Sequence, residues 1–335
     1  MMSALGDRLC ASHSKAKVVI GFAETATAIG AVVASQLKDC IYIHTTREQL
    51  LERENCLCFQ EEHSHAVDQS LYYKTLREAF ATTEEVILVD DEISTGKTLI
   101  NIVAKIKETF PCLKNVPFIA ASLINRVSKE NVERLLQNGI VCEALLKLPN
   151  ESYDSLISKY DITAPKEIKA TTAEYSITEK KFPPIADPRL GVNAALYAKK
   201  WQETALQAAE QLRADLSGCQ SVAVVGTEEC MYPSLAIGQA LEKAFTACKV
   251  CVHATTRSPI GVCQDVGYPI QNGYKLHSFY EAERETFIYN VARYDAVIIV
   301  SDSAHNTDSA LLDLCSIFTA HGCKQFFMLR GNNDV

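Results

Sequence analysis

Residues 86–98 read Val-Ile-Leu-Val-Asp-Asp-Glu-Ile-Ser-Thr-Gly-Lys-Thr, and this stretch decides the fold. Four aliphatic residues in a row predict a buried strand of a parallel sheet. We expect the strand to end at Asp90 and Asp91, and a helix to begin at about Thr98. The loop between them is rich in Ser, Thr and Gly, so it offers backbone N–H groups and hydroxyls to an anion, with the helix dipole behind them. Gly96 allows a close approach that a Cβ would block. The stretch therefore predicts a phosphate-binding strand–loop–helix unit.

Two alternatives for this stretch fail on spacing. Gly96-Lys97-Thr98 ends like an NTPase P-loop, but that motif requires Gly five positions before Gly96, where the chain has Asp91. Capping of the helix would need one polar residue next to it, not two acids six or more positions earlier. We therefore interpret the two carboxylates as acceptors for the two hydroxyls of a ribose, at the carboxyl end of a strand, where open α/β sheets bind ligands.

Strands and helices alternate in the first half of the chain, which predicts a parallel sheet covered on both faces. The expected strands are 18–21, 40–44, 86–89 and 118–124, and the expected helices are 26–37 and 99–109.

The second half repeats this pattern. The strand 222–226 runs into Gly as 18–21 does, and 253–257 (His-Ala-Thr-Thr-Arg) echoes 43–47 (Ile-His-Thr-Thr-Arg). The run 297–302 echoes 87–91, and Glu24 and Glu229 each follow the Gly by three positions. Any doubly wound domain contains strand–Gly–helix units, but that does not account for two Thr-Thr-Arg triplets. We therefore predict an α/β protein with two doubly wound parallel-sheet domains, the second a degenerate copy.

Prolines at 165, 183, 184 and 188 mark the predicted domain boundary. We expect a first domain over 1–165, a linker over 166–192 and a second domain over 193–335. The second domain is expected to open with a long amphipathic helix over 194–216.

The bulk composition excludes several classes of protein. The formal net charge is −8, which argues against general nucleic-acid binding. No apolar run is long enough to cross a bilayer, and residues 1–17 lack the apolar core of a signal peptide. We therefore expect a cytoplasmic protein that binds neither nucleic acid nor membrane.

The 13 cysteines are expected to be reduced thiols. Cys56 and Cys58 are two positions apart, and Cys248 and Cys251 form a CxxC without the second pair that a zinc site would need. We interpret the cysteines as packing residues.

With these motifs in view, the sequence resembles the type I phosphoribosyltransferases, whose signature is four apolar residues, two acids and a hydroxyl- and Gly-rich loop. Glu92 departs from that pattern. Residues 90–96, 21–28, 44–47 and 61–66 are similar to one orotate phosphoribosyltransferase-like subfamily, which is associated with tellurium-resistance operons. Its members carry a C-terminal TRSP domain named for a Thr-Arg-Ser-Pro tetrad, here residues 256–259. The resemblance extends from about residue 18 to about residue 330.

The resemblance implies 5-phosphoribosyl 1-diphosphate (PRPP) as the ligand of the first domain. Residues of the loop would hold the 5-phosphate: Ser94, Thr95, Gly96, Lys97 and Thr98. Asp90 and Asp91 would hold the ribose, with Glu92 beside them, and Mg²⁺ would bind through PRPP and these two aspartates. The diphosphate would lie on the turn after Gly21 and on the Thr-Thr pair: Ala23, Glu24, Thr25, Thr27, Thr45 and Thr46.

Two further residues carry expectations of their own. Arg47 would clamp the diphosphate bidentately, the alternative being a surface salt bridge. His63 lies among Glu61, Glu62 and His65, where type I enzymes have a mobile loop, and it would pass a proton. Substrate contact, a metal site and a solvated loop stay open as other interpretations of that segment.

The second domain loses the acid pair, because Ser301 and Asp302 stand there and residues 303–308 contain no Gly. Its Thr255, Thr256, Arg257 and Ser258 still look like an anion site, so we expect it to bind something else or to complete an interface.

The implied activity is transfer of phosphoribose from PRPP to a nitrogenous base, with release of diphosphate and with Mg²⁺ as cofactor. The alternative is a non-catalytic PRPP- or nucleotide-binding regulatory protein. A PRPP synthetase is disfavoured, because its C-terminal copy carries the PRPP motif, the reverse of the order here. The acceptor would be a small molecule, its base is not named by the sequence, and the resemblance admits a homodimer.

Overall fold

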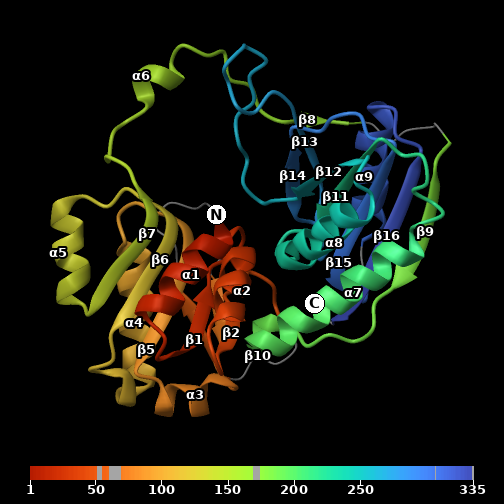
Figure 1. The fold of residues 1–335 in the computed structure, drawn as a ribbon. Coiled ribbons are helices and arrows are strands. Elements are labelled where there is room, and N and C mark those ends of the chain that lie inside the picture. The colour runs from red at the N-terminus through yellow and green to blue at the C-terminus, as the bar shows by residue number, and fades with distance from the viewer. Residues whose placement is uncertain (51–54, 60–68, 169–173, 306, 334–335) are drawn as a thin grey trace. The chain divides into compact units, whose positions relative to one another are not determined.

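The computed structural model describes residues 1–50, 55–59, 69–168, 174–305 and 307–333. The chain divides into two compact units, unit 1 with residues 1–151 and 186–200, and unit 2 with residues 152–185 and 201–335 (Figure 1). Within the described ranges, no helix is both long and apolar enough to cross a membrane.

Unit 1 is built on one six-stranded sheet in the order β10-β2-β1-β5-β6-β7. Its strands are β1 (Ala16–Gly21), β2 (Ile41–His44), β5 (Glu85–Ile93), β6 (Phe118–Asn125), β7 (Ile140–Lys147) and β10 (Val192–Asn193), with β3 (Cys56–Phe59) and β4 (Gln69–Tyr72) as a separate hairpin. Its helices are α1 (Met2–Ser12), α2 (Ala26–Gln36), α3 (Leu76–Thr82), α4 (Lys97–Thr109), α5 (Lys129–Gln137), η1 (Pro111–Leu113) and η2 (Pro188–Leu190). All pairs in the sheet are parallel except β10 with β2.

The strand order of unit 1 creates a switch point between β1 and β5. The chain moves from β1 to β2 in one direction and from β5 to β6 in the other. Because crossovers between parallel strands are right-handed, α2 and α4 cover opposite faces of the sheet. A crevice at the carboxyl ends of β1 and β5 is therefore the place where this topology binds ligands.

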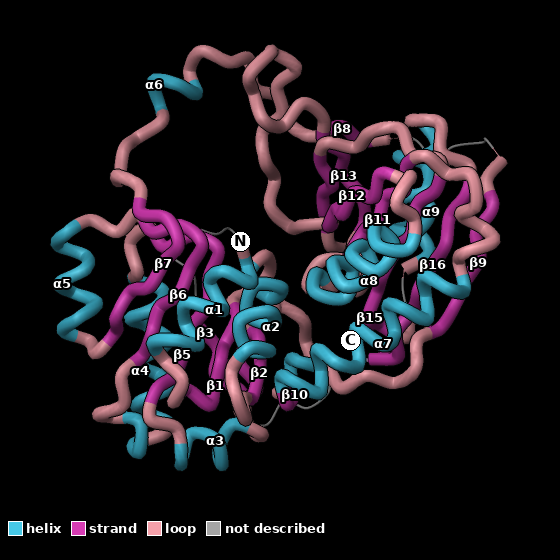
Figure 2. The backbone as a smooth tube through the Cα atoms, in the orientation of Figure 1, coloured by secondary structure: helices cyan, strands magenta, loops and turns pink. Residues whose placement is uncertain are grey.

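Unit 2 is built on a five-stranded sheet in the order β12-β11-β15-β16-β9, in which every pair is parallel. Its strands are β8 (Lys166–Glu167), β9 (Ser176–Lys181), β11 (Ser221–Gly226), β12 (Lys249–Ala254), β13 (Gly273–His277), β14 (Glu285–Tyr289), β15 (Ala296–Ser303) and β16 (Gln325–Asn333). Its helices are α6 (Asp154–Ile157), α8 (Met231–Ala244), α9 (Asp308–Ala320) and the part of α7 (Ala194–Gln211) that follows Lys200. In Figure 2 the strands of each unit run side by side with helices flanking them.

Apolar residues fill both faces of the unit 2 sheet. Along β11, Val222 and Val224 point into a core shared with α7 and α8, whereas Ala223 and Val225 point into a second core shared with α9 and the β13–β14 hairpin. This alternation is what a strand buried on both faces requires, and it explains why β11 reads as a continuous aliphatic run.

The two sheets share one topology, because β2-β1-β5-β6 and β12-β11-β15-β16 have the same order. The registers agree as well: Gly21 pairs with Val89, and Gly226 pairs with Val300. By this register Asp90 corresponds to Ser301. The predicted class, two doubly wound α/β domains of which the second is a degenerate copy, is confirmed.

The segment 166–192 is not the linker that the prolines indicated. Strand β9 pairs with β16 over six residues as an edge strand of unit 2, and β10 pairs with β2 in unit 1. The chain thus passes into unit 2 after Glu151, returns to unit 1 at Ala186 and leaves it again within α7. Helix α7 also ends at Gln211, five residues before the expected end.

Candidate functional site

Strand β5 continues through the acidic residues instead of ending at them. Its pairing with β6 runs on through Asp90 to Ile93, while its pairing with β1 stops at Val89. Successive residues of a strand point to opposite faces, so Asp90 and Asp91 are not two neighbouring acceptors on one face. Asp90 is half-buried and Asp91 is exposed. Both carboxylates nevertheless lie at the switch point, beyond the last residue of β1.

Glu92 lies on the same side of the strand as Asp90, two positions further on. Its Oε1 accepts a hydrogen bond of 3.4 Å from Arg126 Nη1, and Arg126 also donates to the backbone carbonyl of Glu151 at 2.6 Å. Arg126 follows β6 and was not singled out by the sequence, because nothing in its local pattern indicates a partner 34 positions away. This ion pair holds the Glu92 side chain against the residue that follows β6.

The loop from Ser94 to Gly96 connects β5 to α4. Gly96 is the residue before the helix, and its φ of 73° lies in the left-handed region that favours Gly. A Cβ there would lie 2.8 Å from Leu135 Cδ1. Gly96 is thus required by its conformation and by packing against α5, in addition to any approach of a phosphate. Ser94 is exposed, and Thr95, Lys97 and Thr98 are half-buried.

The turn after β1 is fixed by hydrogen bonds from the neighbouring strands. The backbone N–H of Phe22 donates to the Val89 carbonyl at 3.0 Å, and that of Ala23 donates to Thr45 Oγ1 at 2.9 Å. The Gln69 side chain closes the arrangement, since its Nε2 donates to the Ala23 carbonyl at 3.4 Å and its Oε1 accepts from Thr45 Oγ1. Gln69 was also missed, because only the placement of the β3–β4 hairpin brings it here.

Several predicted ligand residues use their side chains inside this turn. Thr27 Oγ1 donates to the Glu24 carbonyl at 2.8 Å, and Thr46 Oγ1 accepts from the Glu48 N–H at 2.9 Å. The Ala23–Glu24 peptide bond is cis. Thr25 is exposed on the turn. These side chains therefore shape the turn, and it is the turn itself that faces the switch point.

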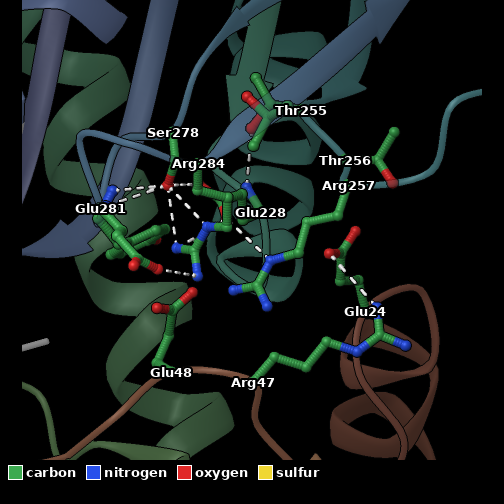
Figure 3. A network of polar contacts seen from close by, with 12 residues as sticks. Glu24, Arg47, Glu48, Glu228, Thr255, Thr256, Arg257, Ser278, Glu281 and Arg284 are labelled. Carbon is green, nitrogen blue, oxygen red and sulfur yellow. Dashed lines mark hydrogen bonds and ion pairs between the residues drawn. The ribbon is translucent and has the colours of Figure 1, made fainter. Parts of the chain in front are cut away.

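Arg47 is not a surface residue. Its side chain is 9% exposed, and Nη1 lies 3.9 Å from Oε1 of Glu24, whose side chain is 4% exposed (Figure 3). Burial of a charged group is costly unless the group has a partner of opposite charge, so each side chain offsets part of the cost of burying the other. The arrangement places one guanidinium and one carboxylate beside the turn, where an anionic ligand would compete with Glu24 for Arg47.

The structure brings three predicted groups together at the carboxyl ends of β1, β2 and β5: the turn at 23–27, the Thr-Thr-Arg triplet at 45–47 and the acids of β5. The loop at 94–98 follows on the same strand. The remaining predicted residues, Glu61, Glu62, His63 and His65, lie outside the described residues.

Unit 2 repeats the backbone of this site. Thr255 Oγ1 accepts a hydrogen bond of 3.0 Å from the Glu228 N–H, as Thr45 does from Ala23. The Thr227 N–H donates to the Val300 carbonyl at 3.1 Å, as that of Phe22 does to Val89. Thr256 Oγ1 accepts from the Ser258 N–H at 3.2 Å. The predicted anion site at 255–258 is therefore a copy of the Thr-Thr-Arg turn.

Arg257 already has an anion within unit 2. Its Nε lies 3.1 Å from Glu228 Oε2, and Arg284 Nη2 lies 3.2 Å from the same oxygen (Figure 3). The sequence pattern matched Glu24 with Glu229, and the backbone register agrees with that match. The carboxylate that contacts Arg257, however, belongs to Glu228, the residue before Glu229.

In unit 2, the residues at the carboxyl end of β15 are buried as well. Ser301, Asp302 and Ser303 are all buried, in contrast to Asp90 and Asp91. The Tyr280 hydroxyl donates to Asp302 Oδ1 at 2.7 Å. Unit 2 therefore buries among its own side chains the positions that are half-buried or exposed in unit 1.

Comparison with known proteins finds one domain family in each half of the chain. Residues 1–147 match the family described as phosphoribosyl transferase (PRTase_2), and residues 187–317 match the TRSP domain found C-terminal to PRTase_2. Among solved structures, one similar chain is APRTase from Giardia lamblia in complex with 9-deazaadenine, at 16% identity and a TM-score of 0.34 over 44% of this chain and 79% of that one. No match was found among curated proteins. The two matched domains confirm the architecture that the resemblance predicted.

Proposed function

Because this chain consists of a phosphoribosyl transferase domain followed by a TRSP domain, we propose that unit 1 transfers phosphoribose from PRPP to a nitrogenous base. The bond from C1 of the ribose to the diphosphate oxygen breaks, and a bond from C1 to a nitrogen of the base forms. The diphosphate leaves with the bonding electron pair, and the base nitrogen gives up its proton.

One observation carries the proposal: at the switch point, the acids of β5 extend past the end of β1 and lead into a loop whose last residue is Gly96. Asp90 and Asp91 point to opposite sides of β5 but both lie beyond the end of β1, so each would accept a hydrogen bond from a different ribose hydroxyl. The loop at 94–98 would hold the 5-phosphate at the N-terminus of α4. The turn at 23–27 would hold the diphosphate, with Arg47 exchanging part of its contact with Glu24 for phosphate oxygens.

The residues present fit Mg²⁺ bound mainly through the substrate. Mg²⁺ in phosphate sites takes one or two carboxylates together with phosphate oxygens and water. Within the described ranges, no group of three or more His, Cys, Asp and Glu side chains is placed to hold a metal by protein ligands alone. Asp90 and Asp91 would supply the protein's share, and the ion would neutralise charge on the leaving diphosphate.

The test is diphosphate release from PRPP by the full chain, with MgCl₂ and a panel of purine and pyrimidine bases. We expect release that depends on one base or a few. Asp90→Asn combined with Asp91→Asn should lower it at least about 100-fold, because each lost charge-assisted hydrogen bond is worth about 1.5–3 kcal/mol. Asp302→Asn is the matched control in unit 2, and it should leave release unchanged.

The same variants separate an enzyme from a binding protein. PRPP that raises the melting temperature of wild type but not of the double variant, with no diphosphate release for any base, would indicate a non-catalytic PRPP-binding protein. Equal PRPP protection of wild type and double variant would remove the two aspartates from the site.

A further inference from the structure

Ala23 and Glu228 occupy the same position in the two copies of the site. Each is the second residue after the Gly that ends the first strand, and each donates its N–H to the first Thr of a Thr-Thr-Arg triplet. The difference lies in the side chain: unit 1 has a methyl group where unit 2 has a carboxylate. Glu228 also has a φ of 47°, in a region that residues with a Cβ rarely adopt.

The Glu228 carboxylate is fully buried and receives four donors (Figure 3). Oε2 faces Arg257 Nε at 3.1 Å and Arg284 Nη2 at 3.2 Å. Oε1 accepts from Ser278 Oγ at 2.7 Å and from the Phe279 N–H at 3.2 Å. Two guanidinium groups, a hydroxyl and a backbone N–H around one oxyanion are the donors that proteins use for phosphate groups.

Three of these donors come from the connection between β13 and β14. Ser278 and Phe279 follow β13, and Arg284 precedes β14. Strand β14 corresponds to β4, because Phe287 pairs with Thr256 as Ser70 pairs with Thr46. The β13–β14 connection thus closes over the turn after β11 by binding a carboxylate that belongs to the chain itself.

The strand end of unit 2 leaves no comparable place for a ribose. Asp302 Oδ1 accepts a hydrogen bond of 2.7 Å from the Tyr280 hydroxyl, and the Thr227 carbonyl lies 3.0 Å from the same hydroxyl. Ser301 and Ser303, the residues before and after Asp302, are buried. A ligand that reached the Glu228 position would therefore meet the anion cradle without the ribose acceptors.

We propose that Glu228 is a built-in anion that occupies the diphosphate position of the duplicated site and closes unit 2 to phosphate ligands. This inference rests on the function proposed for unit 1, where Ala23 supplies no carboxylate at the same position and Arg47 lies 3.9 Å from Glu24 instead. Removal of the carboxylate, with Glu228→Ala reproducing Ala23, opens a second site. That site takes inorganic diphosphate but not the ribose of PRPP.

The experiment is calorimetric titration of the full chain with inorganic diphosphate and Mg²⁺. We expect one site per chain in wild type and two in Glu228→Ala, whereas PRPP should fill one site in both. One diphosphate site in both proteins, or two in wild type, would overturn the inference. No site in wild type and one in Glu228→Ala would refute the function proposed for unit 1 and leave the closure of unit 2 standing. No site in either protein would overturn both.

Two control variants test whether the second diphosphate site arises from the emptied Glu228 position and not from a general change in the fold. Glu228→Gln keeps the position filled, so one diphosphate site is expected. Glu281→Ala removes an exposed acid that lies 3.3 Å from Arg284, and it should behave as wild type. A second diphosphate site in Glu281→Ala would show that any lost acid near Arg284 creates one, which would overturn the special role of Glu228.

Glu228→Ala leaves two buried arginines without their carboxylate, so its melting temperature is measured as well. Acetate and diphosphate should each raise the melting temperature of this variant more than that of wild type, and NaCl at equal ionic strength should not. The effect should vanish in Glu228→Ala combined with Arg257→Ala, where half of the cradle's positive charge is gone. Equal responses of Glu228→Ala and wild type to both anions would count against the built-in anion.

Discussion

The hydroxyl of Thr45 accepts a hydrogen bond of 2.9 Å from the backbone N–H of Ala23, and the hydroxyl of Thr255 does the same for Glu228 at 3.0 Å. These four residues are fully or almost fully buried. One buried hydroxyl thus fixes the turn after the first strand in each copy, and the pair allows a comparison within one chain.

Thr45→Val should destabilise unit 1, because the N–H of Ala23 loses its acceptor in a buried place. The cost of such an unsatisfied donor is about 1–3 kcal/mol. Diphosphate affinity should fall as well, since the turn that would bind it is no longer held. Urea denaturation measures the first effect and calorimetric titration with Mg²⁺ and diphosphate the second.

Thr255→Val is the matched control. It should reduce the unfolding free energy by a similar amount while diphosphate affinity stays at the wild-type value, because the copied turn is closed by Glu228. An equal fall of diphosphate affinity in both variants would mean that the substitutions act on the protein as a whole and not on the turn of unit 1.

The cysteines should divide by burial when the folded protein is treated with iodoacetamide. Burial raises the pKa of Cys40 and of Cys315 to about 12, so both stay as unreactive thiols. Cys58 and Cys112 are exposed, and we expect these two to be alkylated first. Peptide mass spectrometry after short labelling reads the order, and early modification of Cys40 or Cys315 would contradict the packing seen here.

The exposure of Cys58 also corrects the interpretation of all cysteines as packing residues. Cys58 and Cys56 lie on one side of β3, with their sulfur atoms 3.9 Å apart. Strand β3 pairs only with β4 within the described part of the chain, so its short run of Cys-Leu-Cys-Phe is not enclosed as the aliphatic strands are.

The central strands of both sheets could be predicted from the sequence, because a strand covered on both faces must be aliphatic throughout. Edge strands do not follow that rule, because they need not be covered on both faces. Strand β9, with the sequence Ser-Ile-Thr-Glu-Lys-Lys, is almost entirely exposed, and its composition is that of a linker although its backbone pairs with β16. Strand β5 continues past Val89 for a related reason, since backbone pairing with β6 does not depend on whether the side chain is acidic.

The candidate site was predictable where its residues follow strands directly. The turn at 23–27, the triplet at 45–47 and the acids of β5 meet because parallel strands end at one edge of the sheet. Gln69, Arg126 and Glu228 could not be found in this way. Each acts through a partner at least 24 positions away, and that pairing is decided by where a hairpin or loop is placed in the fold.

The requirement for Gly at position 96, before α4, can be tested by stability measurements. Gly96→Ala should lower the unfolding free energy, because a φ of 73° costs a residue with a Cβ about 1–2 kcal/mol. The new methyl group also meets Leu135 Cδ1 at 2.8 Å. Leu135→Ala in the same chain removes the steric part and leaves the conformational part.

A double-mutant cycle separates these contributions. The cost of Gly96→Ala should be smaller in the Leu135→Ala background than in wild type, by more than the error of the denaturation measurement. If the two costs are equal, the contact with Leu135 plays no part in the requirement for Gly, and the backbone conformation accounts for it alone.

Unit 2 should lose stability in mild acid because of two half-buried histidines. Burial lowers the pKa of His253 and of His321 below the ordinary value of 6.5. Each ring nitrogen Nε2 lies 2.8 Å from a tyrosine hydroxyl, that of Tyr294 for His253 and that of Tyr274 for His321. Burial disfavours the charged imidazolium, so the folded state resists protonation of both rings.

The sign of the pH effect follows from proton linkage. Below pH 6.5 the unfolded chain binds protons at these histidines that the folded chain does not, so the unfolding free energy rises with pH in that range. The contribution is complete above pH 6.5 and is lost as the pH falls towards the lowered pKa values. Urea denaturation at pH 7.5 and 5.5 should therefore give a lower unfolding free energy at pH 5.5. His253→Gln combined with His321→Gln should reduce that difference, since Gln can keep a hydrogen bond to the tyrosine but does not titrate. An unchanged pH dependence in the double variant would assign the acid sensitivity to other groups.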